Sequence, residues 1–117
     1  MGHTVIDAAD VEPSFGLFRK MRVALGATGF GINQVDLPPG AAGREHDEAE
    51  SGQEEVYVAL SGSGVMRIDD EEVELVEGRW LRVDPAHTRQ PVAGPDGLTL
   101  LMVGGTPGQG FVPRHNL

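Results

Sequence analysis

The sequence contains no cysteine among its 117 residues. Disulfide bonds, thiolate metal sites and cysteine nucleophiles are therefore excluded. Positive charge is also scarce, because nine lysine and arginine residues stand against eighteen aspartate and glutamate residues and leave a formal charge of −9. A chain this acidic repels phosphate backbones and anionic lipid surfaces, so we expect neither a nucleic acid nor a membrane as a partner.

Long apolar segments are missing as well. No apolar run approaches the roughly 20 residues that span a bilayer. The first residues, MGHTVIDAADVEPS, have neither the basic start nor the apolar core of a secretion signal, so we expect a cytoplasmic protein. Hydrophobic residues make up 39% and charged residues 23% of the chain, a globular composition, and the length suits one domain with a single core.

Glycine and proline divide the chain into short segments that favour β-strands. Turn signals recur about every 8–12 residues, which is typical of a sandwich or barrel. A helical pattern is confined to residues 13–26, where Gly16 weakens it. The sequence therefore predicts one all-β domain, with strand-forming segments at residues 30–40, 54–62, 64–78, 78–86 and 97–105. The third of these segments predicts two strands around an acidic turn at residues 69–71.

Residues 61–64, with the sequence SGSG, are a weak glycine-rich signal. Predicted strands lie on both sides and no helix follows. We therefore interpret this stretch as a tight turn between two strands and not as a phosphate-binding loop.

Two motifs in this chain resemble those of the cupin superfamily. In the first cupin motif a glycine lies six positions before a histidine, as Gly40 and His46 do, and a glutamate lies seven positions before a closing glycine, as Glu55 and Gly62 do. The second motif begins with a glycine, matched by Gly78, and passes through a strand to a proline-containing turn, as GRWLRVDPAHTR does. Together the motifs cover most of the chain.

The resemblance implies a small single-domain cupin of the cupin 2 conserved-barrel type. Its fold would be a jelly-roll β-barrel, also called a double-stranded β-helix, formed by residues 30–117. Residues 1–29 would pack on this barrel or on a partner chain, and cupins of this length resemble homodimeric members. In the predicted strand at residues 78–86, Leu81 and Val83 look like core, which leaves Trp80 on the other face, either for a subunit contact or packed under the N-terminal segment.

The metal motifs are degenerate. Glu48 stands where the family has its second histidine, and Arg89 stands where it has its last one, while His87 lies two positions early. The resemblance implies a site inside the barrel, and alternation along a strand would point His46 and Glu48 the same way and place Glu55 and Tyr57 on one face. His46, Glu48 and Glu55 could then hold a divalent ion, and two carboxylates favour Mn, Fe or Zn.

Arg89 favours a different hypothesis. A guanidinium has no lone pair for a metal and would repel a cation, but it could pair with Glu55 or Glu48. The barrel would then be a metal-free pocket for a polar or anionic molecule, with Arg89, Tyr57 and His87 as candidate ligand contacts. Each residue also has a structural interpretation: His46 in a loop, Glu48 in a solvated acidic cluster, His87 at the rim and Tyr57 in the core.

Three functions are consistent with these patterns. The first is a protein that binds a small polar or anionic molecule in its barrel. The second is a metal-dependent enzyme of the dioxygenase or isomerase type, which uses the reduced ligand set. The third is a non-catalytic structural or interaction module, which predicts a barrel filled by side chains.

Overall fold

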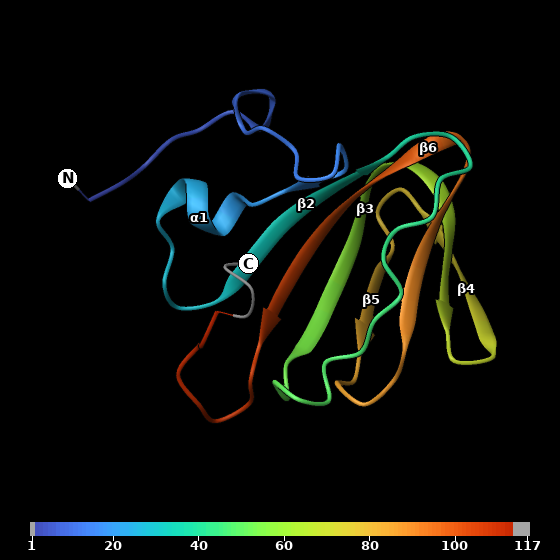
Figure 1. Ribbon diagram of the computed structural model, residues 1–117. Coiled ribbons are helices and arrows are strands. Elements are labelled where there is room, and N and C mark those ends of the chain that lie inside the picture. The colour runs from blue at the N-terminus through green and yellow to red at the C-terminus, as the bar shows by residue number, and fades with distance from the viewer. Residues whose placement is uncertain (1, 114–117) are drawn as a thin grey trace.

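Strands form most of the regular structure in the computed structural model, which describes residues 2–113 (Figure 1). All strand pairs are antiparallel, so the predicted all-β class is confirmed. Among these described residues, one short α-helix forms, and it lies within the stretch for which the sequence predicted helical turns. The elements are a 3-10 helix η1 (Ala8–Asp10), β1 (Phe18–Arg19), α1 (Met21–Leu25), β2 (Gly31–Leu37), β3 (Glu54–Ile68), β4 (Glu71–Val76), β5 (Trp80–Val83) and β6 (Arg89–Gly105).

The two long strands, β3 and β6, pair with each other along most of their lengths and connect the two halves of the barrel. The strand order is β1-β2-β6-β3-β4, and β5 pairs with the other edge of the first part of β3. β4 pairs instead with the second part of β3. The same two strands thus contribute to both layers, as expected for a sheet that curls into a jelly roll.

The SGSG stretch is not a turn, so this prediction was wrong. β3 continues through residues 61–64, with pairing offsets between Ala59 and Ser61 and between Gly62 and Gly64. A Cβ atom on Gly62, which has a φ of +77°, would lie 2.1 Å from the carbonyl oxygen of Gly97, and a Cβ on Gly64 would lie 2.2 Å from that of Val92. The glycines therefore do not form a turn but allow two bent strands to approach each other closely. β6 is likewise longer than predicted, because it begins at Arg89 and not at residue 97.

The core lies on the inner face of the curled sheet. Strand β2 alternates between buried and half-buried residues, and its buried Val35 lies level with Leu100 of β6 and Ala59 of β3. Val83 is also buried and Leu81 packs against the core, as predicted. Trp80 is 71% exposed, so the N-terminal segment does not cover it.

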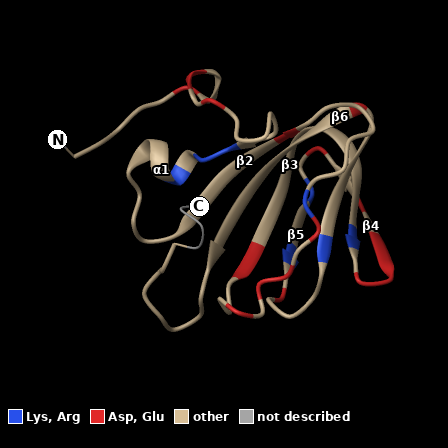
Figure 2. Ribbon diagram, viewed as in Figure 1, with Lys and Arg blue, Asp and Glu red and all other residues tan. Residues whose placement is uncertain are grey.

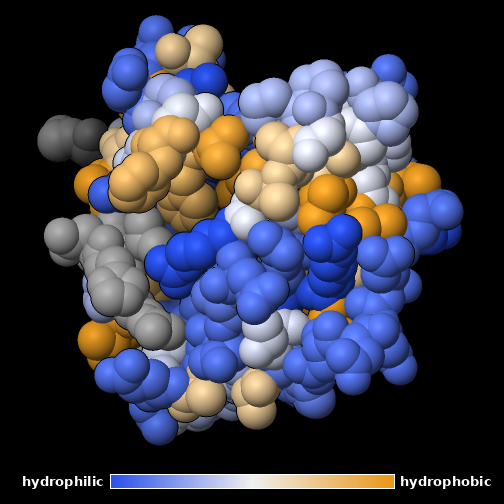
Figure 3. Space-filling view, turned by 45° about the vertical axis from the view of Figure 1, so that its right-hand side comes forward, coloured by the Kyte–Doolittle hydropathy of each residue, from blue (hydrophilic) through white to orange (hydrophobic). Residues whose placement is uncertain are grey.

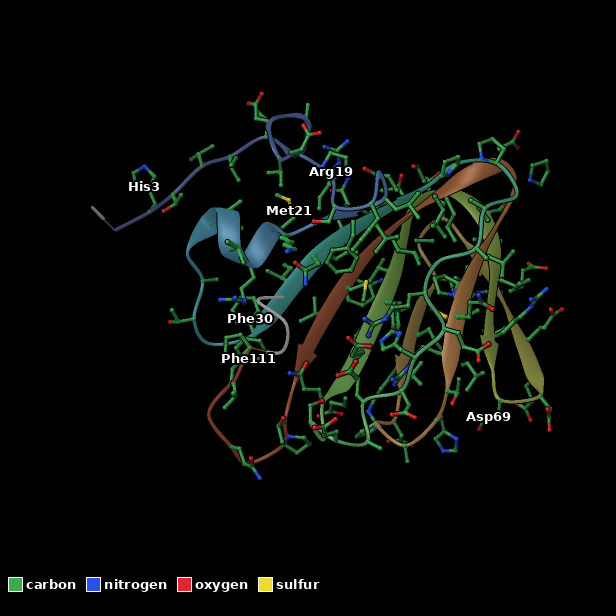
Figure 4. All side chains as sticks on the ribbon, viewed as in Figure 1. His3, Arg19, Met21, Phe30, Asp69 and Phe111 are labelled. Atoms are coloured by element: carbon green, nitrogen blue, oxygen red, sulfur yellow. The ribbon has the colours of Figure 1, made fainter. Side chains whose placement is uncertain are left out.

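The N-terminal segment adds a short strand to the sheet, since β1 pairs with β2 through Phe18 and Val35. Arg19 links this segment to the barrel: its Nε lies 2.6 Å from Oδ2 of Asp36, and its Nη1 donates to the carbonyl oxygens of Ala8 and Val11 (Figure 4). Phe18 and Arg19 thus contact β2 of the same chain. Packing of the whole N-terminal segment on this barrel or on a partner chain stays a prediction.

Charge and hydropathy are unevenly distributed. Figure 2 shows acidic residues at the lower ends of β3 and β4. Hydrophilic residues cover much of the lower half of the face in Figure 3, and hydrophobic residues gather above them. None of the helices in the described chain is both long enough and apolar enough to cross a bilayer.

Candidate metal and ligand site

Three side chains from the ten-residue stretch 46–55 meet inside the barrel. Nε2 of His46 lies 3.2 Å from Oε2 of Glu48 and 3.4 Å from Oε1 of Glu55. One potential ligand atom from each residue lies within 4.8 Å of the others. Both carboxylates are buried, so the acidic stretch after His46 is only partly a solvated surface.

Backbone contacts position the two residues that precede β3. The amide of His46 donates to the carbonyl oxygen of Arg89, and the amide of Arg89 donates back, so His46 lies along the edge of β6 as a strand residue would. Two residues later, the amide of Glu48 donates to the carbonyl oxygen of Pro85, and Ser51 donates from its hydroxyl to Oε1 of Glu48 at 2.8 Å. Alternation therefore directs both side chains inward.

Glu55 projects from β3 and is held by Tyr57 on the same face. The Tyr57 hydroxyl donates a 2.5 Å hydrogen bond to Oε1 of Glu55. Burial raises the pKa of Tyr57 well above 10, and the negative charge of Glu55 raises it further, so the hydroxyl keeps its proton. Glu54, the preceding residue, points the other way and pairs with Arg82.

Arg89 is fully buried behind Glu55. Its Nη2 donates to the carbonyl oxygen of Asp84 at 2.8 Å, and its Nη1 lies 3.9 Å from Oε1 of Glu55. Nε and Nη1 have no hydrogen-bond partner among residues 2–113. The side chain is not part of the cavity wall, so direct contact between Arg89 and a ligand stays a prediction.

The two carboxylates control the charge of His46. Burial alone lowers the pKa of His46, but hydrogen bonds from its ring to Glu48 and Glu55 outweigh burial and raise the pKa to about 9. Without a metal, the imidazole is therefore protonated at neutral pH and neutralises part of the carboxylate charge.

The three side chains line one end of a cavity of about 650 Å³. Tyr57 also lines this cavity, as do Phe15 and Phe18, which the sequence singled out only as a possible cover over Trp80 or a segment exchanged with a partner chain. Four further lining residues were not singled out: Asn33, Gln53, Met102 and Phe111. Asn33 was detectable in principle, because it alternates with Val35 and Leu37 on the inner face of β2.

His87 lies apart from this group. Its Nδ1 is 2.6 Å from Oδ2 of Asp69, and both residues are exposed. They line a separate depression of about 420 Å³. Figure 4 places Asp69 on the opposite side of the molecule from Phe111, which lines the main cavity. A ligand contact by His87 stays a prediction.

Solved structures of other proteins have this fold. A cupin protein from Bacteroides fragilis is 27% identical, with a TM-score of 0.78 over 99% of this chain and 94% of that chain. This chain is a small cupin domain. A cupin 2 conserved barrel domain protein from Salinispora arenicola shares the fold at 18% identity, with a TM-score of 0.67 over 89% of this chain and 87% of that one.

A sugar phosphate isomerase of the cupin superfamily from Silicibacter pomeroyi is also similar to this cupin. It is 27% identical, with a TM-score of 0.63, and the match covers 74% of this chain and 57% of that chain. No protein-family model matches the sequence, and no curated protein does. The function must therefore be inferred from the fold and from the group formed by His46, Glu48 and Glu55.

Proposed function

We propose that this cupin binds a small polar or anionic molecule in its barrel, at a divalent metal ion held by His46, Glu48 and Glu55. The observation that carries the proposal is the convergence of one nitrogen and two oxygen donors within 4.8 Å of one another at the end of a cavity. A structural module without a ligand predicts a barrel filled by side chains, which this cavity argues against.

The donor set fits a divalent ion. One imidazole and two carboxylates suit Mn²⁺, Fe²⁺ or Zn²⁺, and three protein ligands leave positions open for a bound molecule. Nδ1 of His46 lies 3.4 Å from the carbonyl oxygen of Arg44, which favours the tautomer whose Nε2 lone pair faces the carboxylates. Such an ion would polarise an oxygen of the bound molecule. Tyr57 and Ser51 would hold the carboxylates in place.

Arg89 sets the strength of this site. Its guanidinium lies behind Glu55 and partly neutralises that carboxylate. Metal binding should therefore be weaker than in a site that has a neutral fourth ligand in place of the arginine. The buried cation also stabilises Glu55 when no metal is bound. We expect metal affinity in the micromolar range for this reason.

Calorimetric titration of chelator-treated protein with Mn²⁺ and Zn²⁺ tests the proposal. Glu55→Gln should abolish binding. Glu54→Gln is the matched control, because Glu54 is the preceding residue of the same strand and faces Arg82 on the outer side. One strong site lost only in Glu55→Gln supports the proposal, whereas no binding, or equal binding by both variants, contradicts it.

A metal-dependent isomerase is a second candidate. The cupin from Silicibacter pomeroyi that is described as a sugar phosphate isomerase matches 74% of this chain. Lys20 and Arg44 line the same cavity as the acidic group, so a phosphate and a metal-bound oxygen could be held at once. NMR of pentose and hexose phosphates incubated with Mn²⁺-loaded protein tests this candidate, and unchanged spectra would rule these substrates out.

We also infer that two copies associate through the surface around Trp80. Trp80 is exposed at 71% and Leu60 at 45%. Arg82 and its partners Glu54 and Asp84 lie beside Trp80. In a dimer with a two-fold axis, charges of opposite sign on the two copies would therefore face each other. Sedimentation equilibrium should give twice the chain mass for the native protein and the single mass for Trp80→Ser. A monomeric native protein would exclude the dimer.

A further inference from the structure

We propose that the molecule bound in the barrel has an oxygen-rich head at the His46–Glu48–Glu55 group, an apolar body, and a hydrogen-bond donor that meets Asn33. This inference rests on the proposed function and specifies the class of ligand. It follows from how side chains are arranged across the inner face of the sheet, starting from Glu55.

Beside Glu55 the inner face carries two glycines, one on each of the next two strands. Glu55 of β3 lies level with Gly104 of β6, which lies level with Gly31 of β2. Both glycines line the cavity, and other side chains pack over them: a Cβ atom on Gly104 would lie 3.1 Å from Oε1 of Gln53, and one on Gly31 would lie 3.3 Å from the ring of Phe111. A molecule whose head contacts Glu55 and extends toward these glycines therefore meets the amide of Gln53 and the ring of Phe111.

An aromatic ring covers the second of these glycines. A Cβ atom on Gly31 would lie 3.3 Å from ring atoms of Phe111, so the ring packs directly over that glycine. The guanidinium carbon of Arg22 lies 5.8 Å from the centre of the same ring, which helps to hold it there. Figure 4 shows Phe111 near the end of the barrel, below α1. Gly31 thus has a specific role, since a larger side chain would displace Phe111.

The next level of the inner face is apolar except for one residue. Tyr57, Met102 and Asn33 lie level across β3, β6 and β2, and Phe18 of β1 pairs with the following inner residue, Val35. The cavity wall here is lined by Leu17, Phe18, Val35, Met102 and Phe111. An apolar wall of this kind binds an aromatic or branched aliphatic group by burial of apolar surface.

Asn33 is the exception, and it indicates a ligand. It is 6% exposed, lines the cavity, and its Oδ1 is buried with no hydrogen-bond partner in the part of the chain that the structure describes. An unpaired buried carbonyl oxygen is costly, so such atoms usually have a partner. An N–H or O–H group on the bound molecule would supply it.

Phe15 marks the mouth of the same cavity. It is 97% exposed and has a φ of +56°, a conformation that bulky residues rarely adopt, and Gly16 follows with a φ of +72°. An apolar ring exposed at a cavity mouth adds apolar surface where the body of the ligand would emerge. The mouth and the wall therefore favour the same ligand chemistry.

Two probes that share a head group but differ in their apolar part measure the contribution of the apolar body to binding. Benzohydroxamate and acetohydroxamate carry the same metal-chelating group and N–H donor, and differ in a phenyl against a methyl group. We expect benzohydroxamate to bind at least ten-fold more tightly in calorimetric titrations. The comparison is made with metal-loaded and with metal-free protein, so it reports on the cavity wall even if the chain binds no metal. Equal affinities, or no binding of either probe in both forms, overturn the inference.

Variants locate the effect. Met102→Gln should remove the preference for the phenyl group, Met102→Leu should keep it, and Leu101→Gln, the outward-facing neighbour on β6, should not change it. Asn33→Leu should lower the affinity for benzohydroxamate about five-fold, while the ligand-free variant should melt at the same temperature as the native protein or at a higher one. Native affinity in both Met102→Gln and Asn33→Leu overturns the inference. The titration with Mn²⁺ or Zn²⁺ alone reports separately on the proposed function.

Discussion

Tyr57 donates its hydroxyl hydrogen bond to the oxygen of Glu55 that faces His46. This Oε1 atom lies 2.5 Å from the Tyr57 hydroxyl and 3.4 Å from Nε2 of His46, and Nη1 of Arg89 is 3.9 Å away. Three groups with different chemistry thus surround one carboxylate oxygen. The position and charge of that oxygen connect the stability of the barrel with the proposed binding of a metal.

Tyr57→Phe should weaken metal binding and leave the fold intact. The ring volume stays, but Glu55 loses the donor that orients it, and loss of such an outer partner typically costs about 10–100-fold in metal affinity. Unfolding free energy should fall by about 1–2 kcal/mol. Calorimetric titration and denaturant unfolding measure the two effects, and an unchanged metal affinity would show that Tyr57 does not position Glu55.

Arg89→Met should have opposite effects on stability and on metal affinity. Removal of a fully buried cation leaves Glu55 without its charged neighbour, which should destabilise the metal-free protein by about 3 kcal/mol. The same change removes the charge that opposes a metal ion, so affinity for Zn²⁺ should rise about ten-fold, and the ion should restore part of the lost stability. A variant that binds Zn²⁺ more weakly than the native protein would contradict this account of Arg89.

The stability of the metal-free protein should fall between pH 6.5 and 9. The pKa of His46 is raised from 6.5 to about 9 in the folded state, so its contribution is fully present below pH 6.5 and is lost as the pH rises through 9. Denaturant unfolding in the presence of a chelator should show a decrease on the order of 1–3 kcal/mol across this range. The decrease should be absent in His46→Gln. A native profile that is flat, or that rises with pH, would show that the carboxylates do not hold a protonated imidazole.

Gly62→Ala should strongly destabilise the barrel. The added methyl group would lie 2.1 Å from the carbonyl oxygen of Gly97, and the residue has a φ of +77°, so we expect a loss of about 3 kcal/mol or more. Gly78→Ala is the matched control: its φ is +85°, but no atom lies within 4 Å of the added Cβ, so a loss of about 1 kcal/mol is expected. Similar melting temperatures for the two variants would argue against close contact between β3 and β6.

The fold and the meeting of three side chains were within reach of the sequence because its two motifs resemble those of cupins, and alternation then accounts for which side chains share a face. Residues two apart on a strand share a face, and this rule places Glu55 beside Tyr57 and separates Glu55 from Glu54. The spacing of His46 and Glu48 works in the same way, since backbone hydrogen bonds to Arg89 and Pro85 give this loop the geometry of a strand.

Other features were outside the reach of a pattern. The SGSG stretch could be a turn or a close strand contact, and only the position of β6 decides between them. Arg89 has a long side chain, and its direction depends on the carbonyl oxygens of Val83 and Asp84, which the sequence does not place in space. Alternation places Asn33 on the inner face of β2, but the sequence does not show that its Oδ1 is buried without a hydrogen-bond partner among residues 2–113.

The most direct test of the metal site is anomalous diffraction from crystals of the protein loaded with Zn²⁺, measured on both sides of the zinc absorption edge. We expect one strong peak about 2.0–2.2 Å from Nε2 of His46 and from one oxygen each of Glu48 and Glu55. A map without a peak there, in which Arg89 pairs directly with Glu55, would contradict the account.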